Sequence, residues 1–358
     1  MLHDNGLGLP PATLGSALTI EAVTVPRWDP AIIIGSGVSD SPQLDILRYR
    51  APAKFLAPDI VFSDPQPLLV RGGSFCLLAE RQGVIPASTY LFGSYGWKEL
   101  FGSIDRFEMM PDGDVLVAAN CVAYNYYHWT FQCLAPILIA QFHDLGTGPA
   151  IVVAPLDAVQ REALSLAGVD PARVIELPDS VAAVTERGIH SNLTSGEFAF
   201  VPHPAIAAVF ESLGAVVPQS RFAGRKIFIS RADTTSRKMV NEAALADALA
   251  GRGFDVVIAG RLTLSEQIGL FRDARLIVAQ HGAALTNILF AKPGEEGPII
   301  IELLQENYIH QAFLKISQVK RLRYHVVVNA LLDGGRDGRH DSHWQADIPA
   351  VISLVDSL

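Results

Sequence analysis

Residues 274–302 read ARLIVAQHGAALTNILFAKPGEEGPIIIE and decide the fold that we expect. The β-branched residues within 275–280 are typical of a strand, and residues 284–290 have the small and leucine-rich composition of a helix. A Pro-Gly loop and a second strand at 298–303 follow. In a parallel sheet the carboxyl ends of two such strands open on one edge, where α/β proteins bind ligands. The stretch therefore predicts a βαβ unit with a ligand site at that edge.

Four residues of this stretch are candidate ligand contacts. His281 and Gly282 follow the first strand, and Ala283 precedes a helix whose free N–H groups favour an anion. Gly282 has no Cβ, so a phosphate could approach the backbone closely there. Glu302 is expected at the far end of the second strand. An ordinary βαβ unit with a glycine for close packing would show the same pattern.

Composition indicates a globular protein with room for roughly two domains of ~150 residues each. The chain has 358 residues, of which 49% are hydrophobic and 18% charged, compared with about 25% charged in an average soluble protein. The net charge of -9 provides no overall attraction to nucleic acid or anionic lipid, so we expect no nucleic-acid partner.

Features that report on the cellular compartment favour the cytoplasm. The three cysteines form no C-x-x-C motif and leave an odd number, which suits a reducing environment. Residues 1–15 lack the basic and long apolar regions of a signal peptide, and no apolar run approaches the ~18 residues of a membrane span. We expect a cytoplasmic protein with at most peripheral contact with the inner membrane.

Strands and helices alternate along most of the chain, which predicts an α/β fold with parallel sheets. In a first Rossmann-like half, strands are expected at 115–120, 150–154 and 174–176, with helices from about 126 and over 156–167. In a second half, strands are expected at 226–230, 254–258, 276–280 and 298–303, with helices at about 241–250, 265–274 and 284–290. Short apolar runs at 31–34, 68–70 and 75–78 predict extra strands near the N-terminus.

One histidine and two arginines lie where these strands are predicted to end. His128 falls in the first turn of the helix that follows the strand at 115–120, although a lone histidine is more often structural than catalytic. Arg231 follows the strand at 226–230, and Arg237 lies in the next loop. A guanidinium group donates two hydrogen bonds to one phosphate, so the pair suits a diphosphate. Surface arginines in a polar loop are the alternative.

Two groups of acidic residues and histidines could hold a metal, but each has a simpler explanation. Asp112 and Asp114 form a D-x-D pattern directly before a strand, where a glycine between two aspartates is typical of a turn. A second group lies among glycines in the tail, as in a polar loop: Asp337, His340, Asp341 and His343. We expect no essential metal.

The order and spacing of motifs over residues 115–324 resemble glycosyltransferase family 61. The resemblance rests on RKIFISR at 225–231, Arg237, Asn241, GFDVV at 253–257, Gln267, ARLIV at 274–278, HGAALTN at 281–287 and IEL at 301–303. The segment NYYHW at 125–129 resembles the upstream motif of the family, and residues 313–324 resemble a helix that leads to a tyrosine-bearing strand.

The resemblance implies a GT-B-like fold, in which two Rossmann-like domains face each other across a cleft. We then expect a strand-rich segment over 1–110, an acceptor-side domain over 111–215, a nucleotide-sugar-binding domain over 216–325, and a tail over 326–358 that packs back on the body. The implied reaction is inverting hexosyl or pentosyl transfer from a nucleotide sugar, generally without an essential metal. The acceptor would be a glycan or lipid-linked glycan, as in bacterial capsular polysaccharide synthesis.

Inverting transfer needs a base at the acceptor hydroxyl and groups that stabilise the leaving diphosphate. His128 is the expected base, because imidazole titrates near neutral pH. Glu302 would bind the ribose hydroxyls, for which a carboxylate is a good acceptor. The expected donor-binding residues are Arg231, Arg237, His281, Gly282, Ala283, Asn287 and Glu302, and those of the acceptor side or cleft are Asn125, Trp129 and Gln132.

Gln132 departs from the pattern that the resemblance implies. Members of the family commonly carry Asp or Glu four residues after the motif histidine, and a neutral amide cannot act as a base. A non-catalytic nucleotide-binding scaffold with the same fold therefore stays an alternative. A nicotinamide-dependent oxidoreductase would also use this fold, but no G-x-G-x-x-G follows any predicted strand.

Overall fold

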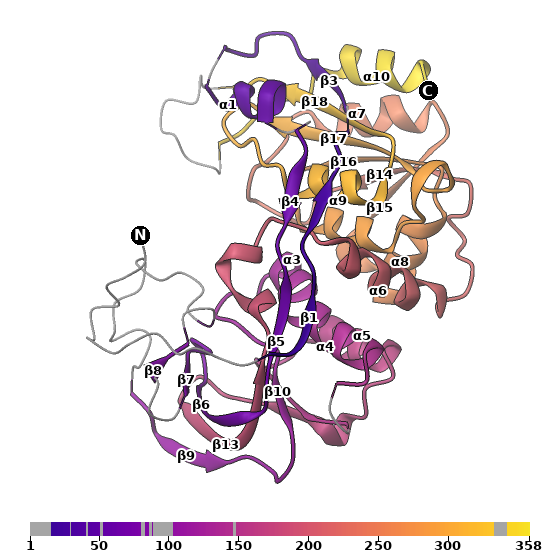
Figure 1. Cartoon of the computed structure of the whole chain (residues 1–358). Helices are drawn as coiled ribbons and strands as arrows, with labels where there is room; N and C mark the ends of the chain where they lie inside the picture. Colours follow the sequence, from indigo (N-terminus) through magenta and orange to yellow (C-terminus); the bar gives the residue numbers. More distant parts are fainter. Residues whose placement is uncertain are drawn as a thin grey trace. The chain divides into compact units, whose positions relative to one another are not determined.

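The computed structural model describes residues 16–28, 30–40, 42–50, 53–79, 83–85, 88, 103–145, 148–332 and 342–358. Contacts divide the chain into two compact units (Figure 1). Unit 1 comprises Met1–Val23 and Ala57–Val209, and unit 2 comprises Thr24–Leu56 and Phe210–Leu358. Each unit mixes helices with a sheet that contains parallel strands, so the α/β prediction is confirmed.

Unit 2 is built on a six-stranded sheet with the order β15-β14-β16-β17-β18-β3. All its paired strands are parallel. Its strands are β3 (Ala31–Ile34), β14 (Lys226–Ser230), β15 (Phe254–Ile258), β16 (Leu276–Gln280), β17 (Ile299–Gln305) and β18 (Tyr324–Asn329). The chain adds β15 on one side of β14 and β16 on the other, so the direction of winding reverses between β14 and β16. Ligands of open α/β sheets bind outside the carboxyl ends of the strands at such a point.

Two groups of helices pack on this sheet (Figure 1). Helix α7 (Glu242–Ala250) contacts α10 (Ile348–Asp356), whereas α8 (Leu264–Asp273) and α9 (Ala312–Lys320) both contact the 3₁₀-helix η8 (Ala283–Phe290). Leucines of α7 and α10 share a core with strand residues such as Val278 and Ile301. Fully burying a large apolar side chain contributes roughly 1.5–3 kcal/mol, so this core holds the strand ends in place.

Two details of unit 2 differ from the prediction, and one strand pairing was not predicted. The helix expected at 284–290 is a 3₁₀-helix, in which buried Thr286 and Asn287 are weak α-helix formers. Strand β17 extends to Gln305, so Glu302 pairs with Ala279 inside the sheet instead of ending the strand. The strand at 31–34 is formed, but its parallel pairing with β18 is a long-range contact that the local pattern did not indicate.

Unit 1 contains a second sheet, with the order β12-β11-β10-β13-β6-β7-β8 and with β9 also paired to β13. Strand β10 (Val115–Val117) runs parallel to both β11 (Ala150–Val153) and β13 (Val181–His190). The carboxyl ends of β10 and β13 therefore share one edge. The other strands are β6 (Gln66–Arg71), β7 (Leu77–Ala79), β8 (Gly83–Val84), β9 (Arg106–Met109) and β12 (Val174–Glu176).

The helical segment that follows β10 has an irregular centre. It begins as α3 (Tyr126–His128), continues as the π-helical η3 (Trp129–Leu134) and ends as α4 (Ala135–Phe142). Pro136 cannot donate to the carbonyl of Gln132 and its ring crowds that carbonyl, which gives a physical reason for the wider turn. Such π-helical turns are frequent at functional sites. Helix α5 (Ala158–Leu166) is regular and starts with a capping box at Asp157.

The remaining elements are short or connect the units. Strand β1 (Ser16–Ile20) pairs with β5 (Ile60–Ser63), and β2 (Val23–Val25) pairs with β4 (Phe55–Ala57). Helices α1 (Pro42–Asp45) and α6 (Pro204–Ala215) lie in the intervening chain. No helix in the described ranges is long and apolar enough to cross a membrane.

Candidate functional sites

The winding reversal of unit 2 brings Arg231 and His281 to one edge of the sheet. Arg231 follows β14 and His281 follows β16. Glu242, the first residue of α7, links the two strand ends. One of its carboxylate oxygens accepts hydrogen bonds from the Ser230 hydroxyl (2.5 Å) and the Arg231 backbone N–H (2.8 Å), and the other accepts from Gln280 Nε2 (3.1 Å).

Gly282 gives the Arg231 side chain the space it occupies. A Cβ at Gly282 would lie 1.9 Å from Arg231 Nη1, and this nitrogen is 3.4 Å from the His281 carbonyl oxygen that accepts its hydrogen bond. The φ angle of Gly282 is 177°, an extended conformation open to any residue, so space rather than backbone conformation requires the glycine. In this structure the group that approaches Gly282 closely is a guanidinium.

Arg237 supplies a second cation beside Arg231. Its φ of 54° is uncommon for a residue other than glycine, and the Trp344 indole N–H donates to its carbonyl oxygen (3.0 Å). Its guanidinium lies 4.8 Å from the centre of the Tyr308 ring, within cation–π range. Non-glycine residues in this conformation cluster at ligand sites.

The two guanidinium groups have the properties of an anion site. The Nε atoms of Arg231 and Arg237 are buried and have no hydrogen-bond partner in the described part of the chain. Burial, and then the positive charge of Arg237, lower the pKa of Arg231 below its ordinary value. A buried donor without a partner costs free energy, and so does like-charge repulsion. A bound anion would relieve both.

His281 is held from behind by a buried carboxylate. Its Nδ1 lies 2.6 Å from Glu302 Oε1, and the Tyr324 hydroxyl donates to Glu302 Oε2 (2.7 Å). Burial, and then the charge of Glu302, raise the pKa of Tyr324 well above its ordinary value, so the hydroxyl keeps its proton and donates. Glu302 is 0% exposed and both of its oxygens are engaged. The expected contact of Glu302 with ribose hydroxyls does not fit this arrangement.

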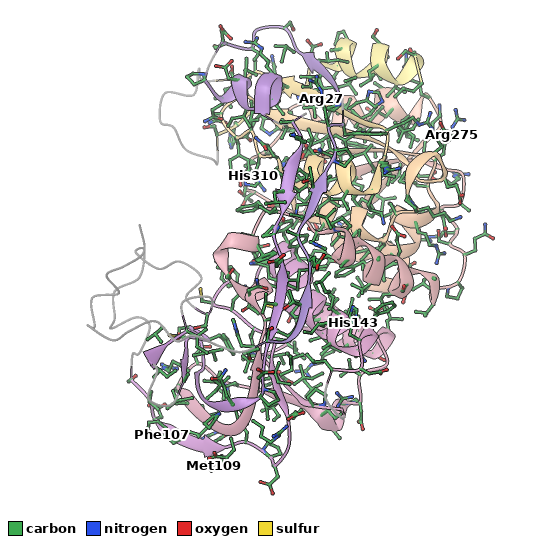
Figure 2. All side chains as sticks on the ribbon, in the orientation of Figure 1. Arg27, Phe107, Met109, His143, Arg275 and His310 are labelled. Carbon is green, nitrogen blue, oxygen red and sulfur yellow. The ribbon has the colours of Figure 1, made fainter. Side chains whose placement is uncertain are left out.

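Aromatic rings surround the other side of His281. Ring centres lie at 4.9 Å for Phe313, 5.3 Å for Tyr308 and 6.0 Å for His310, which is labelled in Figure 2. These residues come from α9 and from the loop that precedes it. These rings restrict rotation of the His281 imidazole. The Tyr308 ring contacts both the imidazole of His281 and the guanidinium of Arg237.

The two other donor-side candidates lie in η8. Ala283 is its first residue, next to the glycine that accommodates Arg231. Asn287 is fully buried, and its side-chain amide donates to Gln267 Oε1 of α8 (3.0 Å). In this structure Asn287 joins η8 to α8.

In unit 1, His128 and Gln132 form a pair. His128 Nδ1 lies 2.9 Å from Gln132 Oε1. The Gln132 amide group donates to the carbonyl oxygens of Ser195 (2.6 Å) and Leu193 (3.3 Å), which follow β13. Gln132 is 0% exposed. A carboxylate at position 132 would face two carbonyl oxygens that only accept, so the local structure explains why an amide stands here.

These contacts fix the neutral tautomer of His128. Because the Gln132 amide nitrogen donates to carbonyl oxygens, Oε1 faces the imidazole and accepts a proton from Nδ1. The lone pair of the neutral ring is then on Nε2. Burial, opposed in part by the hydrogen bond to Gln132, lowers the pKa of His128 below its ordinary value, so the ring is neutral at pH 7. A neutral imidazole with a defined tautomer can accept a proton.

The neighbours of His128 are structural. The Asn125 side chain caps α3 by accepting from the Tyr127 N–H (3.0 Å), and Trp129 is 2% exposed in the core. The rings of Tyr127 and Phe200 meet His128 edge-on at 5.2 and 5.8 Å. Asn125 and Trp129 therefore shape the element that carries His128, and Gln132 is the acceptor-side candidate that contacts it.

The acidic pattern at 112–114 forms a turn. Gly113 has a φ of 98°, and Asp114 pairs with Arg187 (2.7 Å). Among the described residues, no group of three or more His, Cys, Asp or Glu side chains could hold a metal ion. Asp337, His340 and Asp341 lie outside the described residues.

Sequence reasoning missed two residues that organise the unit 2 site. Glu242 is an ordinary acidic residue in a first helical turn, and only the pairing of β14 with β16 shows that it joins both strand ends. Tyr308 lies in an irregular loop whose path no local pattern predicts. Tyr324 was noted as the tyrosine of a strand, and the register of β17 with β18 places it beside Glu302.

A family model matches part of the chain. The sequence model of the family described as Glycosyltransferase 61 matches residues 126–297, which contain His128, Gln132, Arg231, Arg237 and His281. The search of curated proteins found no match. The matched segment begins at α3 of unit 1 and ends directly before β17 of unit 2. The match therefore supports an assignment of this segment to glycosyltransferase family 61.

Proposed function

We propose that this glycosyltransferase moves a hexose or pentose from a nucleotide-sugar donor to a hydroxyl group of a glycan, with inversion at the sugar carbon. The observation that carries the proposal is the pair of guanidinium groups at the winding reversal of unit 2. Arg231 and Arg237 lie close enough for the charge of one to affect the other, and both have buried Nε donors without a partner among the residues that the structure describes. A donor diphosphate supplies the negative charge and the acceptor oxygens that both arginines need.

In the proposed reaction, negative charge develops on the diphosphate as the bond to the sugar breaks. Preorganised cations at the leaving group are among the strongest contributions to such catalysis. Arg231 and Arg237 would supply them. His281 would donate a hydrogen bond to a phosphate oxygen, and the backbone at Gly282 and Ala283 would border the phosphates. Glu302 is assigned a supporting role behind His281 because its carboxylate is buried.

His128 is proposed as the base that takes the proton of the acceptor hydroxyl. Its lowered pKa and its Nδ1–H tautomer both support a proton-accepting Nε2. The proposal includes a GT-B-like arrangement, in which unit 1 serves the acceptor and unit 2 the donor. Gln132 need not signal an inactive scaffold, since its amide sets the tautomer of His128.

We further propose that the donor site needs no metal, because the arginines supply the positive charge. Persistence of turnover in EDTA would test this, and activity restored only by added manganese or magnesium would contradict it. A glycan or lipid-linked glycan acceptor and a place in bacterial capsular polysaccharide synthesis rest on the family resemblance and belong to the same proposal. A cytoplasmic location, with at most peripheral contact with the inner membrane, rests on the cysteine content and the N-terminal sequence and is also part of it.

Replacing Arg231 or Arg237 with alanine should weaken the binding of nucleoside diphosphates. Loss of a charge-assisted hydrogen bond costs on the order of 1.5–3 kcal/mol, or about ten- to a hundred-fold in Kd, measured by titration calorimetry. Arg225→Ala is the matched control, because it removes the same charge from an exposed pair with Asp255 at the other end of β14. Unchanged affinity in both site variants would place the diphosphate elsewhere.

Gly282→Ala should weaken diphosphate binding without a large loss of stability. The added methyl group would occupy the position of Arg231 Nη1, the far end of a flexible side chain that can move away. The melting temperature should stay near that of the wild type, while Kd should rise about as much as in Arg231→Ala. Gly251→Ala, where the added Cβ would have ordinary contacts, is the control. Wild-type affinity in Gly282→Ala would show that the position of Arg231 does not matter.

His128→Ala should lower kcat by about 10²–10⁴-fold, which is typical for loss of a general base, and should leave diphosphate affinity unchanged. Because the pKa of His128 is lowered from 6.5, protonation should reduce wild-type activity only as the pH falls below that value. His143→Ala, at the exposed end of α4, is the control (Figure 2). Full activity in a stable His128 variant would mean that the base lies elsewhere.

A further inference from the structure

The chain of contacts from Tyr324 through Glu302 to His281 places a buried anion directly behind the cationic edge of unit 2. Glu302 is 0% and Tyr324 2% exposed, and the two contacts measure 2.7 and 2.6 Å. Ion pairs on the protein surface are common, but a carboxylate is almost never fully buried without a partner. Here the partner is a histidine at the carboxyl end of β16, next to Arg231 and within an aromatic group that includes Tyr308.

The hydrogen-bond pattern decides where protons lie on His281. Tyr324 donates to one oxygen of Glu302, so the carboxylate is an acceptor, and Nδ1 of His281 must donate to the other oxygen. In the donor site proposed above, the second ring nitrogen, Nε2, would face a phosphate oxygen, which also only accepts. Both nitrogens must then carry hydrogen, and the ring is a cation.

Charge balance favours the same state. A third cation beside Arg231 and Arg237 would be repelled unless an anion compensated it, and a buried charge must be paired. Glu302 provides that anion at a fixed place inside the sheet, in register with Ala279 of β16. The Tyr324 hydroxyl fills the remaining oxygen and keeps the carboxylate oriented towards His281.

We propose that Tyr324 and Glu302 are positioning residues that hold His281 as an imidazolium and direct its Nε2–H to the diphosphate of the donor. The inference rests on the proposed function, because it assigns the nitrogen that contacts the leaving group. Glu302 and Tyr324 act through His281 and do not touch the substrate. Both lie beyond residue 297, outside the segment that the family model matches.

The test measures the affinity of the full chain for inorganic pyrophosphate after Glu302→Gln and Tyr324→Phe. Removing a negative charge near a phosphate site would by simple electrostatics tighten binding. If Tyr324 and Glu302 hold His281 as an imidazolium, the opposite should occur. Kd should rise about tenfold in Glu302→Gln, as for loss of a charge-assisted hydrogen bond, and about 2- to 10-fold in Tyr324→Phe, as for loss of an ordinary one.

Glu306→Gln is the matched control. Glu306 follows the end of the same strand, is 9% exposed, and uses both oxygens to accept from backbone N–H groups of Ser39 and Leu331. The substitution makes the same chemical change without touching His281, so pyrophosphate affinity should not fall. If Glu302→Gln does not fold, Tyr324→Phe carries the test, because it removes only a hydroxyl group.

Nitrogen-15 NMR of the His281 imidazole distinguishes a wrong protonation state of His281 from a wrong location of the diphosphate site. At pH 7 the wild type should show a doubly protonated ring, and Glu302→Gln a neutral one. A neutral His281 ring in the wild type, or wild-type pyrophosphate affinity in both Glu302→Gln and Tyr324→Phe, would show that Tyr324 and Glu302 do not hold His281 as an imidazolium. A wild type that shows the imidazolium but binds no pyrophosphate would support the pairing of Glu302 with a charged His281 and overturn the diphosphate as its ligand.

Discussion

Two arginine side chains with partly buried guanidinium groups set the main constraint on unit 2. Each has a buried Nε without a partner among the described residues, and the charge of Arg237 bears on Arg231. Folding must offset that cost, and the surrounding structure shows how. Glu242 fixes the backbone of Arg231, Trp344 fixes that of Arg237, and the missing side chain of Gly282 leaves room for a guanidinium. Two unsatisfied guanidinium groups at one edge of the sheet support the proposal that an anion binds there.

The position of this edge follows from the order of the strands. Because β15 and β16 lie on opposite sides of β14, the loops after β14 and β16 diverge and leave their ends accessible. In unit 1, two strand ends also share an edge of the sheet, but different side chains lie there. Its β10 and β13 end at one edge, where a neutral histidine and a buried amide meet instead of cations. The contrast suits a donor site that needs positive charge and an acceptor site that needs a proton acceptor.

Much of this could be predicted from the sequence, and the failures have physical reasons. The parallel strands of unit 2 were predictable because runs such as Ile227–Ile229 and Ile299–Ile301 are β-branched or aromatic and lie between turn signals. The positions of Arg231 and His281 at strand ends were predictable because they directly follow the strands expected at 226–230 and 276–280. The role of Glu302 was not predictable, because the hydrogen-bond partners of its carboxylate come from neighbouring strands. The register that places Tyr324 beside it is a long-range property of the sheet. The contacts of Gln132 were likewise not predictable, because they involve the carbonyl groups of Leu193 and Ser195, about sixty residues away.

The proposed function requires that Arg231, Arg237 and His281 form one diphosphate site that binds the donor. Titration calorimetry of the wild-type chain with a panel of nucleoside diphosphates, repeated in the presence of inorganic pyrophosphate, measures this binding. We expect one binding site per chain for at least one nucleotide, with pyrophosphate competing for that site. Nucleotide binding that pyrophosphate does not displace, or no binding of any nucleoside diphosphate, would contradict it.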